Sequence, residues 1–243
     1  MEPTTLQDVW FALIGVLLAG YAVLDGFDLG VGVLSLLRRR PDDRRLMINA
    51  IGPVWDGNEV WLLTASGALF AAFPPVYATV FSGLYLAVML LLVALIARAV
   101  SMEFRGKVDS PRWRAVWDRA FGVGSLVPAL LFGVAVGNLM RGLPLDAHGE
   151  FAGTFLGLLH PFALLVGALA VAMFVCHGAI YMAIKSEGDL AASMLSAARR
   201  AWIAWVALFV AATVLAFFAA PRLLGAAFPR PLTWVAFAAL LAG

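Results

Sequence analysis

Two carboxylates stand inside the first apolar stretch of the chain, residues 9–37. Asp25 and Asp28 belong to the segment Gly-Tyr-Ala-Val-Leu-Asp-Gly-Phe-Asp-Leu-Gly-Val-Gly, residues 20–32. Because they are three residues apart, they share one face of a helix. A charge near the centre of a membrane helix costs roughly 2.5–3.5 kcal/mol, so such acids face protein or a watery cavity and often relay protons. The pattern predicts a path for protons or cations inside a membrane protein.

A second acidic pair follows in the next apolar stretch, residues 47–72. Asp56 and Glu59 are also three residues apart, within the segment Trp-Asp-Gly-Asn-Glu-Val-Trp. They too share a helix face, and Asn58 between them can hydrogen-bond to a carboxylate. Two consecutive helices therefore each offer a pair of acids.

The two pairs are predicted to lie at matching depth. Asp28 lies ten residues before the arginine cluster at 38–45, and Asp56 lies eleven residues after it. At 1.5 Å per residue these separations are about 15 Å and about 17 Å along antiparallel helices. Asp25 and Glu59 lie roughly one turn deeper on their own helices.

Further along the chain, Arg98 and Glu103 flank the end of the third apolar stretch, residues 75–97. We expect both of them at the same side of the membrane as the arginine cluster.

The same residues also have a purely structural interpretation. Buried acids can hydrogen-bond across helices and fix their packing, and Asn58 can serve in the same way. Gly26 and Gly30 form a G-x-x-x-G step that lets a neighbouring helix approach closely. We expect Trp55 and Trp61 to make packing contacts rather than to relay electrons.

Composition defines the class of protein. The chain has 243 residues, of which 63% are hydrophobic and 13% charged, with a mean hydropathy of +0.93. These values are typical of a polytopic, all-α membrane protein and exclude a soluble domain. The one cysteine, Cys176, excludes an intrachain disulfide and any multi-cysteine metal or iron–sulfur site. We expect no nucleic-acid partner and no metal site.

Six full spans are predicted, followed by the start of a seventh. The full spans cover residues 9–37, 47–72, 75–97, 120–139, 156–184 and 202–220. The seventh begins near Leu232 and reaches Gly243, about 18 Å of helix against a hydrocarbon core of roughly 30 Å. We therefore expect a single integral membrane domain over residues 1–243 that is incomplete at its C-terminus.

The distribution of cations predicts the orientation. The first, third and fifth connections hold five, six and three of the seventeen Lys and Arg residues, and the N-terminal tail holds none. Cytoplasmic connections are rich in Lys and Arg. The odd-numbered connections are therefore predicted to be cytoplasmic, with the N-terminus on the outer side of a bacterial cytoplasmic membrane.

Histidines are poor candidates for haem ligands in this chain. His160 and His177 are seventeen residues apart on one predicted helix, about 25 Å, so they cannot bind one iron together. No other predicted span holds a histidine, and His148 lies in a predicted outer loop. We expect this chain alone to bind no cofactor.

Several segments, in order, resemble subunit II of the cytochrome bd-type quinol oxidases. They are residues 20–32, Asn-Ala-Ile-Gly-Pro-Val-Trp-Asp-Gly-Asn-Glu-Val-Trp at 49–61, Gly-Ala-Leu-Phe-Ala-Ala-Phe-Pro at 67–74, Phe-Ser-Gly at 81–83 with Arg98 and Glu-Phe-Arg at 103–105, Gly137-Asn138, and 178–190. The resemblance covers residues 10 to 190.

The resemblance implies a fold and a function. Members of that family form two four-helix bundles, which would correspond here to about 9–139 and, in part, 156–243. They pair with a larger subunit I that carries the b- and d-type haems and the quinol site, and the pair oxidises quinol and reduces dioxygen to water. Subunit II supports a proton route from the cytoplasm to the haems, and the matching positions here are Asp28 and Asp56, with Arg98 and Glu103 at its mouth.

The resemblance also has departures. Glu103 stands where some members have Asp, and His160 and His177 replace amide residues seen in others. Family members have eight spans, so a complete second bundle is not expected here.

Two other functions remain open on the sequence. The chain could be a stand-alone proton-coupled transporter with Asp28 and Asp56 as coupling acids, or a purely structural subunit. In the preferred interpretation it has no catalytic residue of its own; its partners are subunit I, quinol and membrane lipid.

Overall fold

The computed structural model describes residues 5–221 and residue 225, and the regular secondary structure of this part of the chain is helical. The helices are α1 (Thr5–Leu36), α2 (Pro41–Ile51), α3 (Trp55–Ala72), α4 (Pro74–Gly83), α5 (Tyr85–Phe104), α6 (Pro111–Arg141), the 3₁₀ turn η1 (Leu156–Leu158), α7 (Pro161–Lys185) and α8 (Gly188–Ala219). Within the described residues the one β-type pairing is an isolated bridge between Leu145 and Phe151. The prediction of an all-α helix bundle is confirmed.

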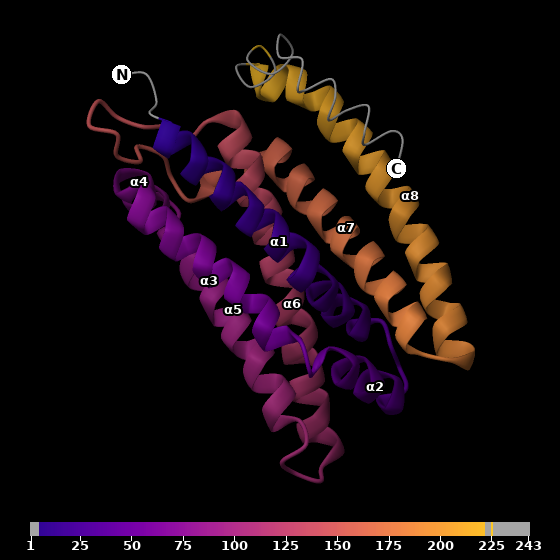
Figure 1. The fold of residues 1–243 in the computed structure, drawn as a ribbon. Coiled ribbons are helices and arrows are strands. Elements are labelled where there is room, and N and C mark those ends of the chain that lie inside the picture. The colour runs from indigo at the N-terminus through magenta and orange to yellow at the C-terminus, as the bar shows by residue number, and fades with distance from the viewer. Residues whose placement is uncertain (1–4, 222–224, 226–243) are drawn as a thin grey trace.

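The long helices run alternately up and down (Figure 1). The connections from α1 to α2, from α5 to α6 and from α7 to α8 meet at one end of the bundle, which we call the arginine-rich end (residues 37–45, 105–119 and 185–189). The start of α1, helix α4 and the loop between α6 and α7 lie at the opposite end. The first and third cation-rich connections thus share one end with Lys185, as the sequence predicts, whereas Arg199 and Arg200 of the predicted fifth connection lie inside α8.

Five helices are long and apolar enough to cross a membrane within the described residues: α1, α5, α6, α7 and α8. Helix α3 is not among them, because Asp56, Asn58 and Glu59 make its first turns polar. The predicted seventh span, from Leu232, lies outside the described residues.

Two predicted spans differ from the structure, because each consists of two helices. The stretch 47–72 is interrupted at Gly52-Pro53-Val54, where the proline has no N–H to continue α2. The stretch 75–97 breaks at Leu84 between α4 and α5, and α5 then runs on to Phe104. Apolar composition identified the membrane-embedded segments, but it carries no signal for these bends.

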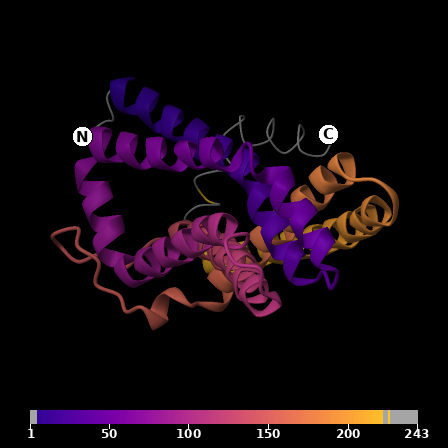
Figure 2. The ribbon, with the colours of Figure 1, turned by 90° about the horizontal axis from the view of Figure 1, so that it is seen from below.

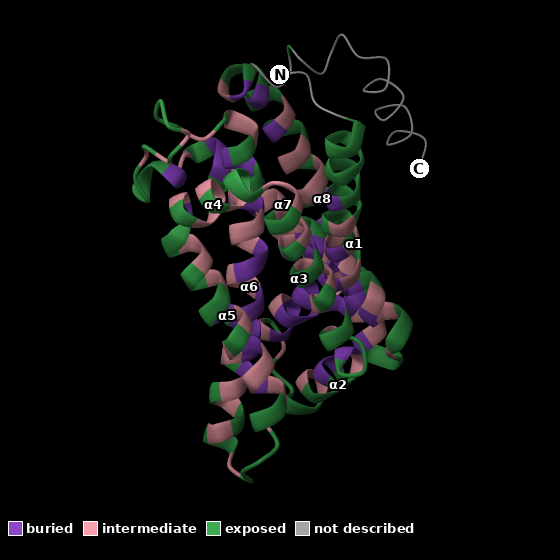
Figure 3. Ribbon diagram, turned by 60° about the vertical axis from the view of Figure 1, so that its left-hand side comes forward, coloured by how far each residue is buried: buried purple, intermediate pink, exposed green. Residues whose placement is uncertain are grey.

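Helix α1 lies at the centre of the fold and packs on α3, α6 and α7. Figure 2, a view from the arginine-rich end, shows α3, α4 and α5 following one another around one side of the molecule. Buried residues gather on the facing sides of α1, α6 and α7, while the outer sides of α5 and α8 are exposed (Figure 3). The outer faces are apolar, which is the surface that lipid requires.

The crossing of α1 and α7 depends on glycine. A Cβ atom added to Gly178 would lie 2.6 Å from the carbonyl carbon of Gly30, and one added to Gly30 would collide with the carbonyl oxygen of Phe174. A Cβ on Gly26 would lie 2.8 Å from the Phe174 ring. The G-x-x-x-G step of α1 therefore lies where the backbones of two helices touch.

A single methyl group tests this close approach. Gly30→Ala should force α1 and α7 apart and cost about 1–3 kcal/mol, as overpacking does. Gly15→Ala, on the same helix with no atom within 4 Å of the added Cβ, is the matched control and should be neutral or slightly stabilising. Thermal unfolding of the purified protein measures both, and equal midpoints for the two variants would contradict the packing described here.

Candidate functional site

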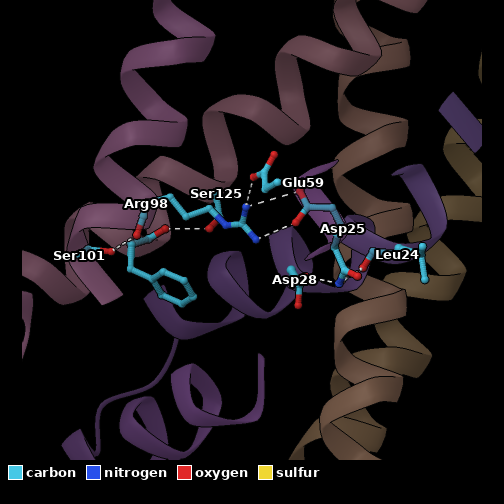
Figure 4. A network of polar contacts seen from close by, with 9 residues as sticks. Leu24, Asp25, Asp28, Glu59, Arg98, Ser101 and Ser125 are labelled. Carbon is cyan, nitrogen blue, oxygen red and sulfur yellow. Dashed lines mark hydrogen bonds and ion pairs between the residues drawn. The ribbon is translucent and has the colours of Figure 1, made fainter. Parts of the chain in front are cut away.

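A buried arginine on α5 is the centre of the largest polar cluster in the described chain. The Arg98 side chain is 1% exposed, and its Nη2 donates to Asp25 Oδ1 at 2.9 Å. Its Nη1 donates to Glu59 Oε1 at 2.6 Å. Figure 4 shows the guanidinium reaching from its own helix toward carboxylates on α1 and α3. One cation therefore joins three helices through charge-assisted hydrogen bonds.

Small residues allow Arg98 to occupy this position. A Cβ on Gly124 of α6 would lie 2.9 Å from the Arg98 nitrogen, so α6 packs directly on the α5 backbone there. One turn later, Ser101 Oγ donates to the Arg98 carbonyl at 2.6 Å. On α6, Ser125 Oγ donates to the Phe121 carbonyl at 2.8 Å, so its hydroxyl is satisfied within its own helix. The side chain of Arg98 is left to extend toward α1.

Asp28 has a different environment from Asp25. Asn58 Nδ2 donates to Asp28 Oδ2 at 2.7 Å and to the Leu24 carbonyl at 3.0 Å, which ties α3 to α1. Asp28 is fully buried, and its Oδ1 makes no hydrogen bond to any residue that the structure describes. No arginine or lysine of this described part forms an ion pair with Asp28. Its second oxygen is thus the buried carboxylate atom that can take a proton without losing a protein contact.

Tyr21 is a member of this cluster that the sequence analysis did not select. It lies four residues before Asp25 on the same face of α1, is 4% exposed, and packs edge-on against Phe132 at 5.3 Å between ring centroids. Its buried hydroxyl meets the geometric criteria for a hydrogen bond with none of the described residues. The i, i+4 spacing from Tyr21 to Asp25 was the signal that could have found it.

Two predicted site residues lie outside the cluster. Asp56, in the first turn of α3, and Glu103, in the last turn of α5, are exposed and make no hydrogen bond or ion pair within the described residues. Arg98 also differs from its prediction, because it is buried inside α5 and does not flank the end of that helix. Trp55 is the first residue of α3 and is partly buried.

The histidines have other contacts. His160 lies just before α7, and its Nδ1 accepts a hydrogen bond from the Phe162 N–H at 3.2 Å, which caps the helix. Partial burial, and secondarily nearby Arg141, lower the pKa of His160, which favours the neutral ring that this cap needs. His177 packs edge-on against Phe27 at 5.6 Å. The described residues hold no cluster of three or more His, Cys, Asp or Glu placed to bind a metal ion.

The described residues thus form a polar cluster inside an apolar helix bundle, with acids of α1 and α3 around one arginine of α5. A family model for cytochrome bd terminal oxidase subunit II matches residues 6–243. The chain belongs to this family.

Relatives and a solved structure agree with this membership. Cytochrome bd-I ubiquinol oxidase subunit 2 of Escherichia coli (strain K12) is 48% identical over 190 residues, which cover 76% of this chain and 50% of the relative. Cytochrome bd ubiquinol oxidase subunit 2 of Bacillus subtilis (strain 168) is 43% identical over 187 residues, covering 76% and 55%. This chain therefore spans about half the length of the curated relatives it matches.

The structure of bd oxidase from Geobacillus thermodenitrificans contains a chain with the same fold. The TM-score is 0.75 at 18% sequence identity, and the match covers 88% of this chain and 66% of that one. At this identity the likeness concerns the fold alone.

The ion cluster predicts a specific pattern of stabilities. Arg98→Gln should be strongly destabilising, by about 3–5 kcal/mol, because it leaves buried carboxylates without their cation. Arg98→Gln combined with Asp25→Asn should be more stable than Arg98→Gln alone, since the second change removes one of the stranded charges. Thermal unfolding of the purified protein gives the comparison.

Arg119→Gln is the control for loss of one positive charge, because Arg119 is exposed and should tolerate the change. Simple additivity of Arg98→Gln and Asp25→Asn would contradict the pairing.

Proposed function

We propose that this chain is the non-haem subunit of a cytochrome bd-type terminal oxidase in a bacterial cytoplasmic membrane. In this proposal it assembles with a haem-bearing partner subunit, and the complex oxidises quinol and reduces dioxygen to water. The family membership and the names of the relatives support the reaction. The five apolar helices support the membrane location.

The haems are assigned to the partner because this chain offers no pair of histidines for them. His160 uses its Nδ1 to cap α7, and His177 packs against an aromatic ring. When bound in the complex, haem supplies the electron transfer and dioxygen chemistry. In this proposal the residues of this chain take up protons and pass them on toward the haems.

The observation that carries the proposed role is the contrast between Asp28 and its neighbours. Arg98 donates charge-assisted hydrogen bonds to both Asp25 and Glu59. Among the described residues Asp28 forms no ion pair; Asn58 holds one of its oxygens, and the other oxygen has no hydrogen-bond partner there. We therefore assign proton uptake and release to Asp28, while the hydrogen bonds from Arg98 hold the other two acids in place.

Asp56 and Glu103 are proposed as the acids that collect protons at the mouth of the path. Both are exposed, and they lie in the turns of α3 and α5 that are nearest the arginine-rich end. The positive-inside rule places this end in the cytoplasm, with the N-terminus on the periplasmic side. A proton would then pass from the surface acids to Asp28 and on toward the partner's haems.

Replacing Asp28 with its amide tests the proposal directly. Asp28→Asn keeps size and shape but cannot exchange a proton, so quinol-dependent oxygen consumption should fall at least tenfold, since positioned proton transfer is worth roughly 10²–10⁴-fold. Asp8→Asn, an exposed acid on the same helix, is the control and should leave the rate unchanged. Asp28→Asn combined with Asp56→Asn should be little slower than the slower single variant, because acids in series act as one unit.

Assembly must be measured on the same samples. The optical difference spectrum of each purified complex should retain the b- and d-type haem bands, which separates loss of proton transfer from loss of the partner. Near-normal turnover of Asp28→Asn with its haems in place would leave the acids with a packing role. Purification of this chain without a haem-bearing subunit would instead favour a stand-alone transporter.

A further inference from the structure

A polar pocket at the arginine-rich end lies apart from the buried acids. It has a volume of about 330 Å³ and lies between α2 and the turn from α5 to α6. Three arginines contribute to its lining, Arg45, Arg105 and Arg114, together with Asn49 and a single acid, Asp42. The wall therefore carries more positive than negative charge. Its size falls within the range of about 300–1,000 Å³ that is typical of small-molecule sites.

One of these arginines, Arg105, is held in place by hydrogen bonds to the buried Asp118 carboxylate and to the Pro41 carbonyl. Arg105 Nε donates to Asp118 Oδ1 at 2.5 Å, and Arg105 Nη2 donates to the Pro41 carbonyl at 3.4 Å. The Asp118 carboxylate is 6% exposed and also accepts from Arg44 at 3.3 Å. Arg105 Nη1 has no protein acceptor among the described residues. This guanidinium is fixed in the wall of the pocket with hydrogen-bonding capacity left over.

The other two arginines are available to an anion. Arg45 is exposed and forms no ion pair or hydrogen bond within the described residues. It shares a face of α2 with Asn49, one turn later. Arg114 pairs with Asp109 at 2.7 Å, but the Asp109 side chain is 94% exposed, and such surface pairs contribute little. Three guanidinium groups and one amide thus border the same space.

Aromatic side chains near the pocket indicate its level relative to the membrane. Phe104, Trp113 and Trp117 form a cluster at the end of α5 and the start of α6, with ring centroids 5.5 to 5.6 Å apart. The Trp113 indole N–H donates to the Phe104 carbonyl at 2.7 Å. Tryptophan is enriched at the level of lipid headgroups. Since Met102 and Gly106 of the pocket flank Phe104 in sequence, the pocket lies at that level.

We propose that this pocket binds the phosphate of an anionic phospholipid headgroup. The arginines match a phosphate diester, because a planar guanidinium can donate two parallel hydrogen bonds to it. Ile48 and Met102 add an apolar wall, which suits the glycerol and first acyl carbons of a lipid better than a free inorganic anion. The headgroup depth points to the same source. This site is independent of the proton path proposed above.

Ligand-induced stabilisation of the purified complex tests the site. The probes are short-chain phosphatidylglycerol, short-chain phosphatidylcholine and inorganic phosphate, each titrated while the thermal unfolding midpoint is recorded. Phosphatidylglycerol should raise the midpoint of the wild-type complex well above the effect of the other two. Its apparent affinity should fall about fivefold in Arg45→Gln and about 25-fold when Arg114→Gln is added, since each arginine near a lipid surface is worth about 1 kcal/mol.

Arg112→Gln is the matched control, because Arg112 is an exposed arginine of the same segment that does not line the pocket. It should bind phosphatidylglycerol like the wild type. Equal effects of phosphatidylcholine and phosphatidylglycerol would overturn recognition of an anion. A response to inorganic phosphate that matches phosphatidylglycerol and is lost in Arg45→Gln would overturn the lipid assignment. Equal affinities in Arg45→Gln and Arg112→Gln, or no response to any probe, would overturn the site.

Discussion

The pairing of Arg98 with Asp25 and Glu59 constrains the rest of the structure. A guanidinium that is almost fully buried among apolar helices is stable only when it is paired and hydrogen-bonded. The carboxylates come from α1 and α3, whereas α5 itself packs on α6. The ion cluster therefore fixes the distance between the pair α1–α3 and the pair α5–α6. Two features make this geometry possible. Gly124 lets α6 pack directly on the backbone of α5, and the short helix α4 connects the end of α3 to the start of α5.

The same pairing also determines the environment of Asp28, because Arg98 donates its hydrogen bonds to Asp25 and Glu59 and not to Asp28. Three buried or partly buried carboxylates surround one arginine, and its hydrogen bonds go to the other two. A third negative charge without a cation is expensive in a medium of low dielectric constant. Protonation of Asp28 removes that cost, and ionisation restores it. A carboxyl group in this position can therefore alternate between two states without breaking the contacts that hold the helices together, which suits a proton carrier better than a structural acid.

Much of this could be predicted from the sequence, because helical periodicity determines which residues share a face. Asp25 and Asp28, the close approach at Gly30, and the common end of the cation-rich connections all follow from spacing alone. The ion-pair partners of Arg98 do not follow from spacing. Periodicity gives the position and face of a residue on its own helix, but it does not tell which residue of another helix that face contacts. Hydropathy placed Arg98 at the end of a span because a charge is unfavourable in lipid, whereas inside the protein two carboxylates compensate it. The break at Pro53 was missed because the span was drawn from hydropathy alone, although a proline within a helical stretch is itself a signal for a break.

The exposed acids of α3 lie on a face of the polar cluster that the described part of this chain leaves uncovered. Asp56 and Glu59 share one face of α3, and Glu59 turns toward Arg98 while keeping 20% of its side chain exposed. Lipid cannot cover such a face, because an ionised carboxylate has no partner in hydrocarbon. On the proposed function, the partner subunit or a water-filled passage between the subunits covers it. On the same proposal, protons collected at Asp56 would enter the cluster along this face of α3, so the first turns of α3 would be both a part of the path and a part of the interface.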